Sequence, residues 1–209
     1  MMALLEERGR PRFILASGSA TRAAMLRASG LSFDVIPAAV DEAALSKSVV
    51  AGNPDVTPAA IAILLARAKA AEVSSRFPEA LVIGGDQVLA LGRDVVFKAP
   101  DYAAAKRILM TLKGRTHMLH SAAAVAQAGA VEWVAADTAQ LTMRDFSAEF
   151  LDDYLARAGD ALTSSAGCYQ IEGLGVQLFE TVSGDHATIL GLPLLPLLAE
   201  LRRRGVLIS

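Results

Sequence analysis

Short apolar runs alternate with helical periodicities along this chain. Phe13–Ala16 reads as a strand, and a helical stretch over about 21–29 follows it and ends at Gly30. A second run at 81–84 is apolar without alternation, which is typical of a strand buried on both faces. Residues 39–58 are polar and contain proline, so we expect a loop with a helical turn.

The remaining pattern predicts further elements, in this order: a strand at 32–37, a helix at 58–74, a hairpin of 87–91 and 94–97 around Gly92-Arg93, a helix at 101–113 capped by Asp101, two long strands at 116–127 and 130–143, a helix capped by Ser147, short strands at 169–172 and 176–182, and a helix at 193–204. We therefore predict an α/β fold whose long, twisted, mixed β-sheet is flanked by helices. No repeat or linker interrupts it, so residues 1–209 are interpreted as a single domain, with two lobes around a cleft.

Composition narrows the class of protein. The chain is 53% hydrophobic with a formal net charge of −2, which argues against a nucleic-acid-binding protein. Its single cysteine, Cys168, is interpreted as a buried hydrophobic residue, and a reducing cytoplasm fits. The N-terminal apolar residues are followed by Glu6 and Glu7, unlike a signal peptide, and the apolar stretch at 190–201 contains prolines and is too short to span a bilayer. We expect a soluble, cytoplasmic protein without a membrane partner.

A turn of small residues, Ser17-Gly18-Ser19-Ala20-Thr21-Arg22, joins the first strand to the first helix. Unpaired N–H groups and the dipole at a helix start favour an anion, and an arginine fork fits phosphate oxygens. The alternative is a plain turn with a serine cap and a surface arginine. Ser17 and Ser19 together offer more hydroxyls than a cap needs, which favours a phosphate site.

Four other positions carry candidate chemistry. Gly84-Gly85-Asp86-Gln87 directly follows the buried strand, where Asp86 is either a turn residue or a carboxylate for metal binding or general-base catalysis. Lys69 lies beside the buried face of its helix, where an unpaired ammonium would be costly. Lys98 follows an apolar strand, and Asp41-Glu42 is either an exposed acid pair or part of a site.

Glu172 lies in a glycine-rich turn, Ser165–Gly175, which is either a surface hairpin or a binding loop. The three histidines lack metal-ligand spacing and are interpreted as structural or surface residues. Cations together with carboxylates are typical of a polyphosphate held with a divalent metal.

These motifs, taken in order, resemble the Maf family over about residues 13–201. The motifs are Leu15-Ala16-Ser17-Gly18-Ser19-Ala20-Thr21-Arg22, Val40-Asp41-Glu42, Leu65-Ala66-Arg67-Ala68-Lys69-Ala70, Ile83-Gly84-Gly85-Asp86-Gln87, Lys98, Leu112-Lys113-Gly114-Arg115-Thr116-His117, Ala166-Gly167-Cys168-Tyr169, Glu172-Gly173-Leu174-Gly175 and Gly191-Leu192-Pro193-Leu194. Members are nucleoside triphosphate pyrophosphatases, also called septum-formation inhibitor-like proteins.

The resemblance implies a fold related to the inosine triphosphate pyrophosphatases, a homodimer and a divalent cation, Mg²⁺ or Mn²⁺. It implies hydrolysis of a standard or modified nucleoside triphosphate to the monophosphate and pyrophosphate, a housecleaning reaction. Asp86 would be the general base and would hold the metal together with Glu42. Lys69 and Lys98 would be further catalytic residues, and Ser17 and Arg22 would contact phosphates alongside them.

The family divides by base preference at three positions, here Thr21, Gln87 and Glu172. Members acting on dTTP and UTP tend to carry Arg, Thr and Gln there, and members acting on 7-methyl-GTP an aromatic residue, Gln and Glu. A glutamate accepts from the adjacent N1–H and N2–H₂ of guanine. Thr21 matches neither group and lacks an aromatic surface for a methylated base. Ala99 also departs from the family's usual proline after Lys98. We expect a broad or guanine-leaning enzyme.

A second hypothesis is a nucleotide-binding regulator of cell division with little turnover. Asp86, Glu42 and the two lysines favour the enzyme, because a pure binder needs no base with a metal.

Overall fold

A mixed β-sheet of seven strands forms the centre of the computed structural model, which describes residues 12–208. Its order is β2-β1-β3-β5-β6-β7, with β4 paired to β3. The strands are β1 (Phe13–Ala16), β2 (Asp34–Val35), β3 (Leu81–Leu91), β4 (Asp94–Val96), β5 (Thr116–Gln127), β6 (Ala130–Met143) and β7 (Phe179–Ser183). β1 runs parallel to β2 and β3, whereas the other pairs are antiparallel. The predicted mixed sheet is confirmed.

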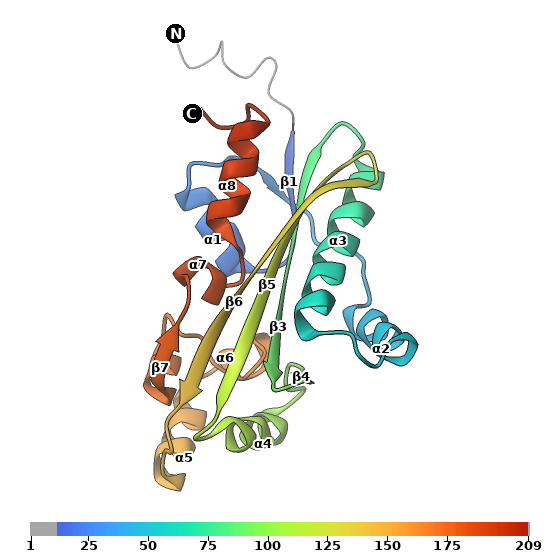
Figure 1. Cartoon of the computed structure of the whole chain (residues 1–209). Helices are drawn as coiled ribbons and strands as arrows, with labels where there is room; N and C mark the ends of the chain where they lie inside the picture. Colours follow the sequence, from blue (N-terminus) through green and yellow to red (C-terminus); the bar gives the residue numbers. More distant parts are fainter. Residues whose placement is uncertain (1–11, 209) are drawn as a thin grey trace.

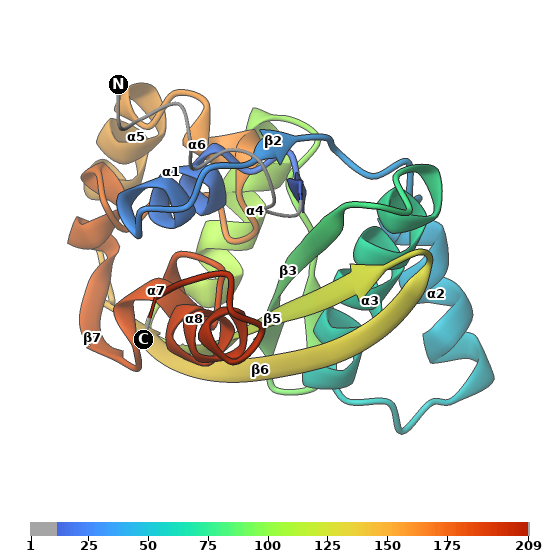
Figure 2. The ribbon, with the colours of Figure 1, turned by 90° about the horizontal axis from the view of Figure 1, so that it is seen from above.

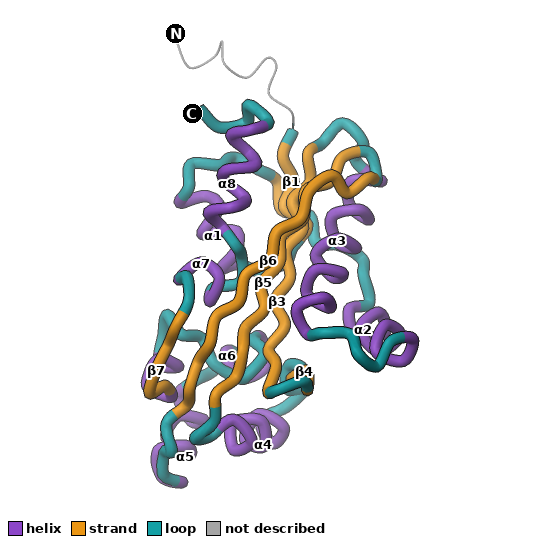
Figure 3. The backbone as a smooth tube through the Cα atoms, viewed as in Figure 1, coloured by secondary structure: helices purple, strands orange, loops and turns teal. Residues whose placement is uncertain are grey.

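Helices cover both faces and one end of this sheet (Figures 1 and 2). They are α1 (Ala20–Ala28), α2 (Glu42–Gly52), α3 (Pro58–Arg76), α4 (Tyr102–Leu112), α5 (Ala148–Arg157), α6 (Ala161–Ser164), α7 (His186–Ile189) and α8 (Leu194–Arg203), with a 3₁₀ turn η1 (Leu174–Leu178). α3 packs on one face of β3 and β5, and α1 and α8 pack on the other. α4 and α5 close the far end (Figure 3). No helix among the described residues is long and apolar enough to cross a membrane.

Side-chain caps fix where the helices begin. Asp101 and Ser147 cap α4 and α5 as predicted, by accepting from Ala104 and Phe150 N–H groups. The loop expected at 39–58 is wrong, because α2 fills 42–52 of it. Asp41 accepts a hydrogen bond from the Ala44 N–H and is the N-cap of α2. Glu42 lies in the first turn, so neither acid of the Asp41-Glu42 pair is an ordinary loop residue.

β3 does not end at Gly84 as predicted, but continues to Leu91. Gly84 and Gly85 serve close packing instead of a turn. A Cβ on Gly84 would lie 2.3 Å from the Ala66 carbonyl oxygen of α3, so only glycine lets the helix approach the strand this closely. Of the two alternatives for Asp86, the turn residue is therefore excluded, because Asp86 lies inside β3.

One edge of β3 is open in its middle. β1 pairs with β3 only as far as Ala16 opposite Gly84, and β4 pairs from Leu89 onward, so residues 85–88 have no strand neighbour on that edge. β5 pairs with the whole of this stretch on the other edge. Successive residues of a strand point to opposite faces, so Asp86 points to the α3 face and Gln87 to the α7 face.

Three other local predictions need correction. Residues 169 and 170 are irregular and 171–173 form a turn, directly after Gly167 (φ +82°) and Cys168 (φ +62°) take left-handed backbone. The next strand begins only at Phe179, because η1 occupies 174–178. The strand at 32–37 contains only Asp34–Val35. The 3.6-residue periodicity of the sequence predicts a buried face of Ile61, Leu64, Leu65, Ala68 and Glu72 for α3, but the observed buried face is rotated from it, and Leu64, Ala68 and Glu72 are half-buried. The residues of α3 that are buried are Pro58, Ile61, Ala62, Leu65, Ala66, Lys69, Ala70, Val73 and Ser74. The signal-peptide argument concerns Met1–Glu7, which lie outside the described residues.

Candidate active site

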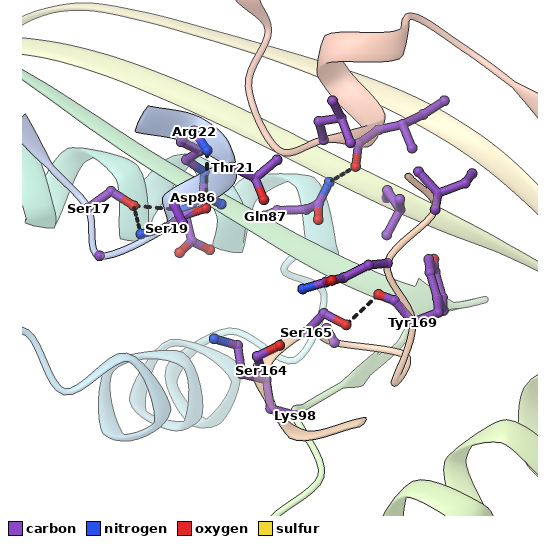
Figure 4. A pocket seen from close by; sticks show the side chains of 18 of the residues that line it. Ser17, Ser19, Thr21, Arg22, Asp86, Gln87, Lys98, Ser164, Ser165 and Tyr169 are labelled. Carbon is purple, nitrogen blue, oxygen red and sulfur yellow. Dashed lines mark hydrogen bonds between the residues drawn. The ribbon is translucent and has the colours of Figure 1, made fainter. Parts of the chain in front are cut away.

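A cavity of about 600 Å³ opens at the free edge of β3, beyond the carboxyl end of β1 (Figure 4). It also contacts α1, α2, α3, the loop after β4 and the segment 164–172. Every residue predicted as a site residue lines it: Ser17, Ser19, Thr21, Arg22, Glu42, Lys69, Asp86, Gln87, Lys98 and Glu172. The end of a parallel strand is where open α/β sheets bind ligands.

The turn after β1 is organised around a buried arginine. Ser19 caps α1 through its Oγ, so the plain-turn interpretation is correct for this residue. Arg22 is not on the surface: it is 9% exposed, with Nε donating to the Gly191 carbonyl at 2.8 Å and Nη1 to Ser17 Oγ at 3.1 Å. Burial lowers the pKa of Arg22, while Asp86 and Glu42 raise it. A guanidinium keeps its charge even so, and it is held rigidly at the cavity wall.

Lys69 joins two carboxylates that come from different elements. Its Nζ lies 2.6 Å from Asp86 Oδ1 and 2.6 Å from Glu42 Oε1. Lys69 and Asp86 are buried, whereas the Glu42 side chain is 52% exposed at the first turn of α2. Burial raises the pKa of Asp86, and the charges of Lys69 and Arg22 oppose that rise. The buried ammonium that the sequence placed beside the apolar stripe is thus paired.

The Gln87 side chain is fixed from the other face of the sheet. Its Nε2 lies 2.9 and 3.1 Å from the carbonyl oxygens of Ile189 and Thr188, and 3.0 Å from Ser121 Oγ. Ser121 donates its own hydrogen to the Thr188 carbonyl, so all three neighbours are acceptors. Because carbonyls only accept, the amide nitrogen must face them, and Oε1 is left toward the cavity (Figure 4).

The other two predicted base-reading residues face each other across the cavity mouth. Thr21 Oγ1 lies 3.5 Å from Glu172 Oε1, although the two residues are 151 positions apart in the chain. Glu172 is exposed, on the turn between α6 and η1. The exposed Lys98 reaches the same cavity from the loop after β4 (Figure 4).

Sequence reasoning missed the residues that hold these groups in place. Ser121 and Thr188 are buried and orient Gln87, but they lie 34 and 101 positions from it. Tyr169 lines the cavity while its hydroxyl lies 2.8 Å from Nε2 of the buried His117. Ser164, Ser165 and Gln170 also line the cavity. The polar, glycine-containing stretch before Glu172 was the one available signal.

The Maf-like protein family model matches residues 12–204, nearly the whole described chain. The chain belongs to the Maf-like family. A 7-methyl-GTP pyrophosphatase of Rhizobium johnstonii is 49% identical over 94% of this chain and 98% of its own length. A nucleoside triphosphate pyrophosphatase of Maricaulis maris is 47% identical over the same shares of the two chains. The resemblance to this family that the motifs indicated is therefore confirmed.

A solved HAM1 protein from Coxiella burnetii aligns with 65% of this Maf-like chain and 74% of its own, at 17% identity and a TM-score of 0.40. So distant a likeness carries no argument about the site.

Proposed function

We propose that this Maf-like protein is a nucleoside triphosphate pyrophosphatase that hydrolyses its substrate to the monophosphate and pyrophosphate. One observation supports this most: in a single cavity, the Lys69 ammonium lies 2.6 Å from an oxygen of Asp86 and 2.6 Å from an oxygen of Glu42, beside the buried Arg22 and Ser17. Names of relatives at 46–49% identity point to the same reaction.

The proposed roles follow from position. Asp86 Oδ1 is the oxygen that a cation occupies, Lys69 in the nucleotide-free protein, so Oδ2 takes a proton from water as that water attacks the α-phosphorus. The bond from the α-phosphorus to the bridging oxygen breaks, and pyrophosphate leaves. Arg22, Lys69 and Lys98, with the hydroxyls of Ser17 and Ser19, bind the phosphate oxygens and offset the charge that develops there.

A divalent cation, Mg²⁺ or Mn²⁺, fits this donor set. Oxygen atoms of Asp86 and Glu42 converge on one point, and hard cations of this kind take one or two carboxylates together with substrate phosphates. No cluster of three or more potential ligand side chains exists among residues 12–208, so phosphates would have to complete the coordination. When bound, the cation supplies positive charge to the phosphate oxygens.

We propose that the preferred substrate carries a nucleobase with hydrogen-bond donors along its edge. Guanine and 7-methylguanine have this property and are preferred to thymine and uracil. Gln87 presents an acceptor because the two N–H groups of its amide are directed at three surrounding acceptors, and Glu172 is an acceptor when ionised. Two acceptors suit the N1–H and N2–H₂ of guanine. Thr21 offers no aromatic surface, so we expect selectivity for the methylated base to be incomplete.

The test is turnover with Mg²⁺ or Mn²⁺ on a panel of GTP, 7-methyl-GTP, dTTP, UTP and CTP, with pyrophosphate and monophosphate measured separately. We expect both products in equal amounts, with guanine nucleotides preferred. Binding without turnover of any nucleotide would favour a regulator instead, and release of orthophosphate would place the attack at another phosphorus.

We also propose, on family grounds, a cytoplasmic homodimer. Light scattering after size-exclusion chromatography measures the mass directly, and a value near the 21.9 kDa of one chain would contradict the dimer.

A further inference from the structure

The Lys69 ammonium lies at the point that two carboxylates share. Its contacts to Asp86 Oδ1 and Glu42 Oε1 are both 2.6 Å, and its side chain is 9% exposed. α3 holds it there by packing its inner face against β3 and β5. The ammonium offsets one of the two carboxylate charges, and the buried Arg22 guanidinium, which interacts with both Asp86 and Glu42, offsets the other.

Any other cation that uses these two oxygens must compete with Lys69. Resting on the proposed function, we infer that Lys69 blocks the metal position until a nucleotide binds. Two cations cannot share one pair of carboxylates without strong repulsion in a partly buried site. Lys69 and Arg22 already balance Asp86 and Glu42, so a divalent cation alone would add uncompensated positive charge.

A triphosphate removes this obstacle. Its oxygens give the ammonium new anionic partners at the same cavity, and they supply the ligands that the two carboxylates lack. Cation and nucleotide therefore bind cooperatively, and each raises the affinity for the other by the same factor. In this scheme Lys69 moves from the carboxylates to the phosphates as the site loads, so it acts in both states.

Lys98 provides the matched comparison within the same cavity. It lines the cavity as Lys69 does, but it is exposed and lies on a loop. Among residues 12–208, no carboxylate lies within ion-pair distance of Lys98, whereas two carboxylates contact Lys69. Removing the charge of Lys98 changes only the electrostatic potential in the cavity. Removing the charge of Lys69 changes this potential as well, and it also leaves Asp86 Oδ1 and Glu42 Oε1 without their cation.

The experiment is a titration of the nucleotide-free protein with Mn²⁺, with free Mn²⁺ followed by electron paramagnetic resonance at pH 8. We expect Lys69→Met to bind Mn²⁺ about tenfold more tightly than the wild type, and Lys98→Met to change the affinity by less than about threefold. Lys69→Gln serves as a second variant, and thermal unfolding shows that each variant is folded. Equal or weaker binding by both folded Lys69 variants would overturn the inference.

A second titration adds a GTP analogue whose α,β-bridging oxygen is replaced by methylene. It should tighten Mn²⁺ binding by the wild type more than by Lys69→Met, because only the wild type has an ammonium to displace. An equal effect on both proteins contradicts the inference. The outcome is separable from the proposed function: turnover without these Mn²⁺ effects defeats the inference alone, and the Mn²⁺ effects without turnover defeat the proposed function alone.

Discussion

Asp86 is the residue on which the proposed chemistry depends. Burial disfavours its charge and raises its pKa, and the cations Lys69 and Arg22 counter this. A carboxylate whose pKa is raised is more basic than an exposed one, and greater basicity favours the removal of a proton from water.

Replacing this carboxylate by its amide isostere tests the role. Asp86→Asn should lower kcat by about 10²–10⁴-fold, because the amide cannot accept the proton from water. The measurement is initial-rate pyrophosphate release with saturating nucleotide. Near-normal kcat would remove Asp86 as the base. In the wild type, kcat/KM should fall on the acid side at a pH above the ordinary range of an aspartate, since the pKa is raised.

Glu172 carries the prediction on base choice. Glu172→Gln replaces an acceptor-only group by one that also donates, so it should shift preference from guanine toward dTTP and UTP, by about tenfold in the ratio of kcat/KM values. Glu180→Gln, an exposed change outside the cavity lining, is the matched control. An unchanged ratio in Glu172→Gln would show that this side chain does not read the base.

Helix α2 positions part of the candidate site, because Glu42 lies in its first turn. Glu42 directly follows the cap residue Asp41, so the start of this helix determines where the Glu42 carboxylate meets Lys69. The precision of the site therefore rests on a single cap.

Asp41→Ala should cost about 1 kcal/mol in the free energy of unfolding, and it should also lower kcat/KM, because the first turn frays and Glu42 loses its place. Asp101→Ala is the matched control. It removes the equivalent cap of α4, a helix whose residues do not line the cavity, so a similar loss of stability should leave kcat/KM unchanged. Denaturant unfolding and steady-state kinetics on both variants check this, and equal kinetic losses would refute the role of the cap.

The bounds of an element could be predicted from the sequence where hydrophobic pattern and turn residues indicated the same structure. β1, β5 and β6 have their expected bounds, since apolar runs between clear turns leave little choice. The prediction was wrong at α2, because two acidic residues before an ordinary helical stretch were interpreted as part of a loop. It was also wrong at β3, because paired glycines indicate a turn unless the packing of α3 against them is known. The site residues were found through motifs, whereas Ser121 and Thr188 were missed because only folding brings them to Gln87.

We expect the buried His117 to make the folded protein less stable in acid. His117 has no exposure, and burial lowers its pKa to about 4. Its unfolded pKa is about 6.5, so from pH 6.5 down to about 4 the unfolded chain binds a proton that the folded protein does not. Stability contributed by neutral His117 is thus complete above pH 6.5 and declines as the pH falls, by up to about 3 kcal/mol.

His117→Gln should flatten that decline, because an amide can still bond the Tyr169 hydroxyl and does not titrate. The measurement is the urea midpoint at intervals between pH 4 and 7. His186→Gln, at an exposed position, should follow the wild type. Parallel curves for wild type and His117→Gln would exclude His117 as the titrating group.

At its open edge, β3 presents two neighbouring residues to the same cavity. Asp86 and Gln87 are neighbours in the chain, yet the sheet places them on opposite sides, one with Lys69 of α3 and the other with the carbonyls of α7. β3 therefore separates the proposed general base from the amide proposed to read the nucleobase, while Arg22 lies on the same side of the strand as Gln87. A substitution at Gln87 can therefore alter which nucleobase is accepted without removing the contact between Asp86 and Lys69 on the other side of the strand.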